Sequence, residues 1–160
     1  MRKRTSSYLL FLLISGLLIC CGRSKNIVFI DTEVIPDETW SLKQVPRFEV
    51  RINDTVSFNN ITFSVRTGSS YPFRNLWLFV TTMAPNGISL TDTLEYKLAD
   101  EKGNWYGKGF GEIHELDLPY RQNVFFPLKG TYIISIRHGM RAENLKGVYD
   151  IGLRVEKIVK

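Results

Sequence analysis

The sequence predicts an all-β fold: an antiparallel β-sandwich or jelly roll of about eight strands, with a closed β-barrel as the alternative. Three observations favour this class. Short apolar segments recur about every ten residues, which is the spacing of strands in such folds. Apolar and polar residues alternate within most of these segments, and turn-forming Gly, Pro, Asn and Asp residues separate them. No long helical period interrupts the series.

The predicted sheet is organised around residues 71–111, which contain its most apolar strand. In residues 76–80, three aliphatic side chains point to one face and Trp77 and Phe79 point to the other, because side chains alternate along a strand. This pattern indicates either a central strand covered on both sides or an aromatic surface available to a partner. We expect the covered arrangement for Trp77 and Phe79.

The next predicted strand, residues 90–98, has one wet face. Its apolar row consists of Leu90, Leu94, Tyr96 and Leu98. The Pro-Asn-Gly sequence at 85–87 and the polar sequence at 100–104 predict turns before and after it.

The other elements follow from the same patterns. Trp40 stands in a polar loop, and we expect it to cover the edge of the core. Residues 141–146 are the one plausible helical turn, ended by Gly147. Periodicity is mixed over residues 113–118. Five further segments fit strands and one short apolar piece fits a sheet edge: residues 27–30, 48–52, 61–65, 132–136 and 149–155, and 124–126 between Pro119 and Pro127. In the last strand the predicted inward row is Tyr149, Ile151, Leu153 and Val155.

The first 20 residues predict a secretory signal, because a basic start precedes a short apolar run at residues 8–19. The Leu-Ile-Cys-Cys sequence that ends at Cys21 resembles the bacterial lipobox, whose cysteine is acylated and becomes the new amino terminus. Cys21 is the predicted lipid attachment site, because counting from Cys20 would put the bulky Ile19 before the cut. An uncleaved anchor is the alternative. We therefore expect a lipoprotein signal peptide (1–20), a lipidated tether (21–26) and a single β-sandwich domain (27–160).

The charge of the mature chain argues against nucleic-acid binding. The whole chain has 21 Lys and Arg residues against 16 Asp and Glu residues. The signal segment removes three of the basic residues and none of the acids, so the net charge falls from +5 to +2. No basic stripe remains to neutralise phosphates. With Cys20 removed and Cys21 acylated, no thiol is left for a disulfide, a metal or a nucleophile.

Few residues suggest chemistry. A hydrolase would need a histidine base, and His114 and His138 are the two histidines, each expected to be a surface or structural residue. Glu112, Glu115 and Asp117 form a carboxylate cluster that fits a solvated face better than a glycosidase pair. Neither zinc spacing nor a phosphate-binding glycine loop is present in the sequence. We expect no enzyme activity, no cofactor, no metal and no small-molecule substrate.

Surface recognition is the remaining expectation. Tyr71, Trp105 and Arg141 are the candidate partner surface, because aromatic residues and arginine dominate interaction hot spots. A carbohydrate-binding sandwich is a second hypothesis, and it would require exposed tryptophans among Trp40, Trp77 and Trp105 to line one groove.

Three sequence words resemble the gliding-motility lipoprotein GldH family of Bacteroidetes. They are YPxxNLWLF at 71–79, LADxxGxWxGxG at 98–109 and MRxxxLxGxxDIGL at 140–153, and the resemblance covers nearly the whole mature chain. It implies an envelope lipoprotein held in the membrane through the lipid on Cys21, with other envelope or gliding-machinery proteins as partners. Gly22 lacks the Asp that commonly retains lipoproteins at the inner membrane, and residues 23–30 lack the acids that often accompany surface display until Asp31. We therefore expect the periplasmic face of the outer membrane.

Overall fold

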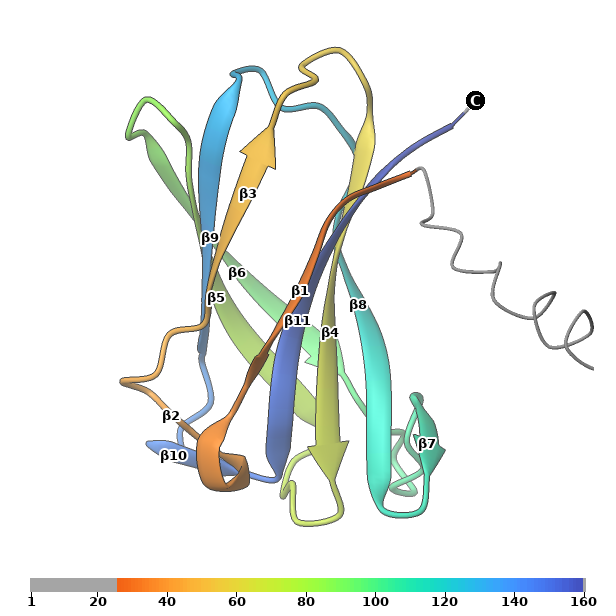
Figure 1. Cartoon of the computed structure of the whole chain (residues 1–160). Helices are drawn as coiled ribbons and strands as arrows, with labels where there is room; N and C mark the ends of the chain where they lie inside the picture. The colour runs from red at the N-terminus through yellow and green to blue at the C-terminus, as the bar shows by residue number, and fades with distance from the viewer. Residues whose placement is uncertain (1–25, 160) are drawn as a thin grey trace, which may run out of the picture.

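The computed structural model describes residues 26–159, so the predicted signal (1–20) and Cys21 lie outside the described residues. Eleven strands and one 3₁₀ turn make up this part of the chain (Figure 1). The 3₁₀ turn η1 spans Pro36–Glu38. The strands are β1 (Ile27–Val34), β2 (Thr39–Ser41), β3 (Arg47–Ile52), β4 (Asn59–Gly68), β5 (Asn75–Met83), β6 (Ser89–Lys97), β7 (Lys108–Phe110), β8 (Ile113–Val124), β9 (Gly130–His138), β10 (Asn144–Lys146) and β11 (Val148–Lys157).

The strands form two antiparallel sheets packed face to face, and a short third sheet lies at one end. The first sheet has the order β1-β11-β4-β8-β7, and the second has the order β3-β9-β5-β6. The third is the pair β10-β2. The predicted all-β sandwich is therefore confirmed, and over the described residues no sheet closes into the alternative barrel.

Polar contacts join the two sheets along both of their edges. On one side, the backbone N–H of Arg47 on β3 donates to Glu33 of β1 at 3.1 Å. On the other side, the hydroxyl of Tyr120 on β8 donates to Asp92 of β6 at 2.6 Å, as does Arg121. Burial alone would raise the pKa of Asp92, but these two donors lower it overall. The sheets are thus held in one relative position from both edges.

The core is the layer of aliphatic and aromatic side chains between the sheets. Alternation along each strand places one row inward, as in β3, where Phe48, Val50 and Ile52 are buried and the residues between them are exposed. The largest fully buried side chains are Trp40, Phe48, Phe63, Ile52, Leu76, Leu78, Leu98, Ile134, Ile136, Leu145, Ile151 and Leu153.

Two local predictions at the end with the short sheet are wrong. Residues 141–146 do not form a helical turn, because Asn144–Lys146 is strand β10 and pairs with β2. Trp40 lies within β2 instead of a loop, opposite Leu145, and its side chain is fully buried, as expected of a residue that covers the core. Six residues that precede a glycine are too few to stabilise a helix against this strand pairing.

Two β-bulges accompany two further differences between the predicted and the observed strands. Residues 124–126 do not form a separate edge piece, because Val124 is the last residue of β8. Pro119 lies within β8, where the register with β4 shifts beside Ile61 and Thr62. In β11 the register shifts between Val148 and Asp150, so Val148 is buried and Tyr149 is only half-buried, contrary to the predicted inward row. Ile151, Leu153 and Val155 do face the core as predicted.

His138, at the end of β9, is a fully buried histidine. Its ring meets Trp40 edge to face, with centroids 5.3 Å apart. Burial lowers the pKa of His138, although the nearby backbone of Trp40 and Glu143 opposes that shift. Neither ring nitrogen makes a hydrogen bond of good geometry with the described residues, so desolvation dominates. The ring is therefore neutral in the folded protein near neutral pH.

The buried His138 predicts a pH-dependent stability. The unfolded chain binds a proton near its ordinary pKa, whereas the folded ring does not, so the free energy of unfolding should fall as pH drops from 7 to 5. One proton gives a slope of at most about 1.4 kcal/mol per pH unit. Urea unfolding at a series of pH values measures it. His138→Phe should flatten the slope and His114→Gln should keep it; an unchanged slope in His138→Phe would contradict this account.

Candidate functional site

The central strand β5 has an apolar row on each face, but the sandwich covers only one of them. Leu76, Leu78 and Val80 are fully buried between the sheets. Trp77 is 37% exposed and Phe79 is half-buried on the outer face of the second sheet. The expectation that these two aromatic residues belong to the core is therefore wrong. The alternative that the sequence allowed, an exposed aromatic surface on this strand, is the one observed.

This outer face is apolar or uncharged over much of its width. Side chains directly opposite each other in antiparallel strands lie on the same face. The register of β6, β5 and β9 therefore groups Trp77, Phe79, Thr81 and Met83 with Thr91, Thr93, Ile133 and Ser135. We call this set the aromatic face. Glu95, Arg137 and the exposed charges of β3 surround it.

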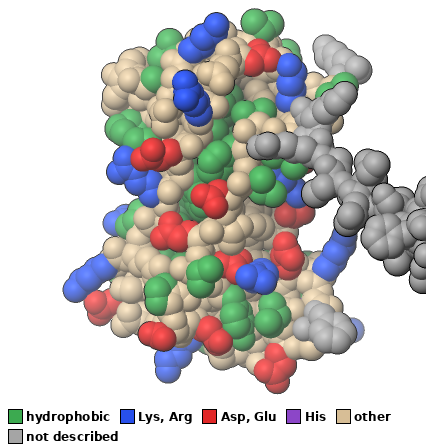
Figure 2. Space-filling view, in the orientation of Figure 1, with side chains coloured by type: hydrophobic (Ala, Val, Ile, Leu, Met, Phe, Trp, Pro, Cys, Tyr) green, Lys and Arg blue, Asp and Glu red, His purple; other side chains and the backbone are tan. Residues whose placement is uncertain are grey.

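The outer face of the other sheet carries ion pairs that join its strands, beside the exposed aliphatic side chains of Ile30 and Val34 on β1. Arg66 of β4 forms a hydrogen-bonded ion pair with the buried Asp150 of β11, which raises the pKa of Arg66. Arg154 pairs with Asp117 at 3.2 Å and with Glu156 at 3.4 Å. Acidic and basic side chains are scattered over the side of the molecule that Figure 2 shows. The two exposed sheet faces thus differ in chemistry, and the aromatic face is the better suited to bury against another protein.

Neighbouring groups hold Trp77 and Phe79 in place. The guanidinium of Arg137 lies 5.2 Å from the centre of the Phe79 ring. The backbone N–H of Gly139 donates to the carbonyl of Trp77 at 2.6 Å. A β-carbon at Gly139 would lie 2.9 Å from the Phe79 ring, so a glycine allows this approach. Met140 contacts the backbone of Trp77 through its sulfur at 3.3 Å. The row is therefore ordered without a bound partner.

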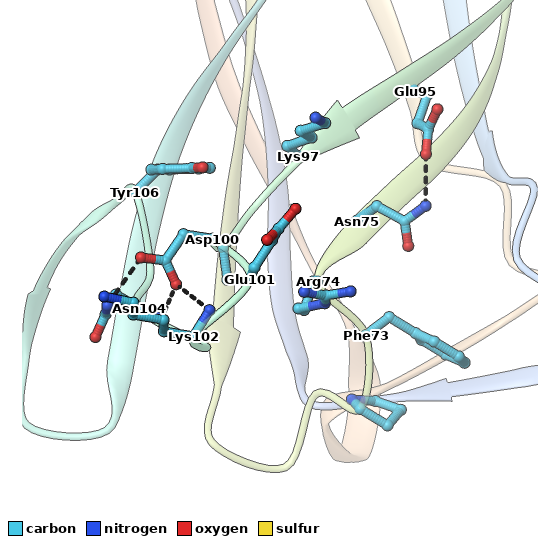
Figure 3. Close-up of a pocket in the computed structure, with 12 residues that line it drawn as sticks. Phe73, Arg74, Asn75, Glu95, Lys97, Asp100, Glu101, Lys102, Asn104 and Tyr106 are labelled. Atoms are coloured by element: carbon cyan, nitrogen blue, oxygen red, sulfur yellow. Dashed lines mark hydrogen bonds between the residues drawn. The ribbon is translucent and has the colours of Figure 1, made fainter.

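A cleft of about 850 Å³ continues the aromatic face toward the end of the molecule with the β6–β7 loop (Figure 3). Asn75 donates to Glu95 at 2.6 Å, and both line the cleft, while Glu95 also lies opposite Trp77 in the register. The lining mixes charges of both signs with aromatic side chains: Phe73, Arg74, Lys97, Glu101, Lys102 and Tyr106. We call this the distal cleft.

One side of the distal cleft is a loop built around Asp100. Its carboxylate accepts hydrogen bonds from the backbone N–H of Lys102 and of Asn104 and from the Asn104 side chain, each at 2.8 Å. Hydrogen bonding by Asn104 lowers the pKa of Asp100. The carboxylate is therefore structural, and it shapes the cleft wall instead of taking part in proton transfer.

The three residues predicted as a partner surface differ in how exposed they are. Tyr71 is only 5% exposed, and its hydroxyl donates to the carbonyl of Asn75 at 2.7 Å, so it is not a surface residue. Trp105 is half-buried, and one face of its ring stacks on His114 with ring centroids 5.0 Å apart. Arg141 is exposed and directly follows Met140, which contacts Trp77. Tyr71 was predicted at the surface and is buried, whereas Trp77 was predicted to be covered and is exposed. The partner surface itself stays a prediction.

The groups considered for catalysis do not assemble. His114 stacks on Trp105, whereas Glu115 and Asp117 point outward on the opposite face of β8. Neither of the two smaller pockets that contain both Glu115 and Asp117 includes His114. Among the described residues no group of three His, Cys, Asp or Glu side chains could hold a metal. Trp40, Trp77 and Trp105 share no groove, which leaves the carbohydrate hypothesis without structural support.

The three sequence words that carry the family resemblance meet in space. Tyr71, from the first word, packs edge to face against Trp105 of the second, with ring centroids 6.1 Å apart. Gly147 of the third word lies against the backbone of Tyr71 with φ at +75°, a conformation that favours glycine. These words therefore encode the packing of one end of the sandwich, beneath the distal cleft.

These features define a class of protein: a β-sandwich with a preformed apolar surface, whose described residues contain no helix that could span a bilayer. The chain belongs to the GldH lipoprotein family, whose profile matches residues 27–155.

Relatives support this assignment over almost the whole sequence. The chain is 33% identical to the gliding motility lipoprotein GldH of Flavobacterium johnsoniae, covering 98% of this chain and 99% of the relative. It is 30% identical to the gliding motility lipoprotein GldH homolog of Christiangramia forsetii, covering 95% and 97%. Among solved structures, a CBM35 domain from Cellvibrio japonicus covers 80% of this chain and 85% of its own at 15% identity. Its TM-score of 0.31 is too low to bear on function.

Proposed function

We propose that this protein is an envelope lipoprotein of the gliding-motility GldH type, and that it works as a non-catalytic component that binds other proteins of motility-associated machinery. The observation that carries the proposal is the unequal chemistry of its two outer sheet faces. One carries ion pairs beside the aliphatic Ile30 and Val34, whereas the aromatic face exposes the large ring of Trp77 beside Phe79. The link to motility comes from its relatives, which are named as gliding motility lipoproteins.

The proposed anchor is a lipid on Cys21, at the periplasmic face of the outer membrane. The supporting features are the lipobox-like sequence before Cys21, the Gly at position 22, and membership in a lipoprotein family. Two or more acyl chains hold a protein stably in a bilayer, whereas one chain does so only marginally. The remaining sequence, from residue 27 onward, is proposed to act as one domain held beside its partners.

Changing Cys21 tests this anchor. In Cys21→Ala, the protein should leave the membrane fraction and appear in the soluble envelope extract, because it has lost its acylation site. Cys20→Ala is the matched control and should stay with the membrane. Ultracentrifugation of envelopes followed by immunoblotting measures both. Membrane retention of the Cys21→Ala protein would contradict the anchor.

The partner surface is tested by crosslinking and affinity capture from envelopes of the source bacterium. Trp77→Ala and Phe79→Ala should lose the same captured proteins by about tenfold, because truncating an aromatic anchor costs 1 to 2 kcal/mol or more. Val34→Ala, an exposed apolar residue on the other outer face, is the matched control and should capture them normally. Urea unfolding of Trp77→Ala measures the stability lost with the buried part of its ring, and capture is compared at a temperature at which the variant is folded, so a binding loss would not reflect unfolding.

Arg141→Ala extends the test to the border of the aromatic face. Its effect should be smaller than that of Trp77→Ala, because an exposed cation contributes little at the rim of an interface. If all three variants recover the same proteins as the unmodified chain, then this face does not bind the partners.

A further inference from the structure

Exposed apolar side chains gather at the end of the sandwich opposite the distal cleft. Nine of the 16 exposed large hydrophobic residues among those described lie there. They come from the start of β1, the β3–β4 loop, the β5–β6 hairpin, the β8–β9 loop and the carboxyl end: Ile27, Val28, Val56, Phe58, Ile88, Leu90, Phe125, Leu128 and Val159. The two loops and the hairpin form the upper end of the molecule in Figure 1. We call this set the apolar end.

Direct contacts tie these segments together. The rings of Phe58 and Phe125 meet edge to face, with centroids 6.2 Å apart. The backbone N–H of Ile158 donates to the carbonyl of Phe58 at 2.8 Å. A β-carbon at Gly130 would lie 2.9 Å from Pro85, so the β8–β9 loop touches the β5–β6 hairpin. An apolar groove of about 380 Å³, which includes Ile88 and Leu90, runs between the hairpin and β8.

The amino-terminal tether joins the sandwich at the same end, at Asn26. The carbonyl of Asn26 accepts a hydrogen bond from the backbone N–H of Lys157 at 2.7 Å, next to Ile158 and thus to Phe58. Asn26 lies five residues after Cys21 in the sequence, and a fully extended chain spans at most about 3.5 Å per residue. An acylated Cys21 therefore keeps Asn26 within about 18 Å of the bilayer interface.

Charges at this end fit a lipid surface. The acidic Asp54 and Asp92 are both engaged by cations: Asp54 by Lys157 at 2.8 Å and Asp92 by Arg121 at 2.6 Å. Arg51 and Lys129 are exposed at the ends of the neighbouring loops. Cations near a bilayer are attracted by its anionic lipids.

We propose that the apolar end docks on the bilayer that holds the lipid of Cys21, with Val56, Phe58 and Phe125 at the headgroup boundary. The proposal rests on the anchor proposed above. The short tether supplies proximity, and the exposed apolar residues add a second point of contact that fixes orientation. The aromatic face then stands upright beside the membrane, and the distal cleft points away from it.

Single cysteines carrying an environment-sensitive fluorophore test this orientation. Val56→Cys and Ile88→Cys replace residues that are 83% and 69% exposed, and Tyr106→Cys, at a residue 62% exposed in the distal cleft, is the matched control. Each full-length, acylated variant is purified in detergent, labelled, and added to preformed vesicles of phosphatidylethanolamine and phosphatidylglycerol. Quenching by aqueous iodide and by nitroxide-labelled lipid is then measured.

Iodide quenching at positions 56 and 88 should be about threefold or more below that at position 106, and nitroxide lipid should quench only positions 56 and 88. Equal iodide quenching at all three positions would overturn the docking. Mass spectrometry of the mature amino terminus and vesicle flotation separate the two proposals. A chain that is acylated and floats but shows equal quenching refutes the docking alone, whereas a chain without acyl groups refutes the anchor and the docking together.

Discussion

The structure depends on one constraint: a two-layer sandwich can cover only one face of each sheet. Strand β5 lies between β9 and β6 with apolar side chains on both faces, so one of its rows has no inner layer to pack against. Leu76, Leu78 and Val80 take the inner side. Trp77 and Phe79 are left outside, at the cost of keeping aromatic surface in water. The proposed binding of another protein would remove that cost.

The rest of the molecule supports this arrangement. Contacts of Glu33 with Arg47 and of Asp92 with Tyr120 hold the two sheets in place from either edge, so the aromatic face is presented on a fixed frame. Gly139 and Arg137 hold Trp77 and Phe79 in position. Because less side-chain freedom is lost when an ordered surface binds, a preformed row favours association. The relatives of this chain are named as gliding motility lipoproteins, and the aromatic face is the surface proposed above for binding other proteins.

Much of the fold could be predicted from sequence, because alternation of apolar residues directly encodes which face of a strand is buried. The strands around Phe48, Phe63 and Ile151 appear where the pattern places them. The failures have physical causes. β10 is only three residues long, and its pairing with Trp40 is a long-range contact that local periodicity does not record. The bulge at Tyr149 moves the inward row by one residue, which alternation cannot anticipate.

The candidate site was harder to predict than the fold for the same reason. Tyr71 and Trp77 both occur in the first family word, and sequence alone does not say which aromatic ring faces water. The answer depended on how many layers cover β5, which is a property of the whole fold. One signal was available: β5 has apolar residues on both faces. Among the described residues the opposite sheet covers only one of these faces, so the other is left exposed.

Oxidative footprinting of tryptophan in intact envelopes, compared with the purified protein, tests the covered aromatic face most directly. The three tryptophans serve as internal standards, because Trp40 is fully buried and Trp105 is half-buried. Trp77 should be oxidised readily in the purified protein and protected in envelopes, while Trp40 is protected in both. Equal oxidation of Trp77 in the two samples would contradict the account.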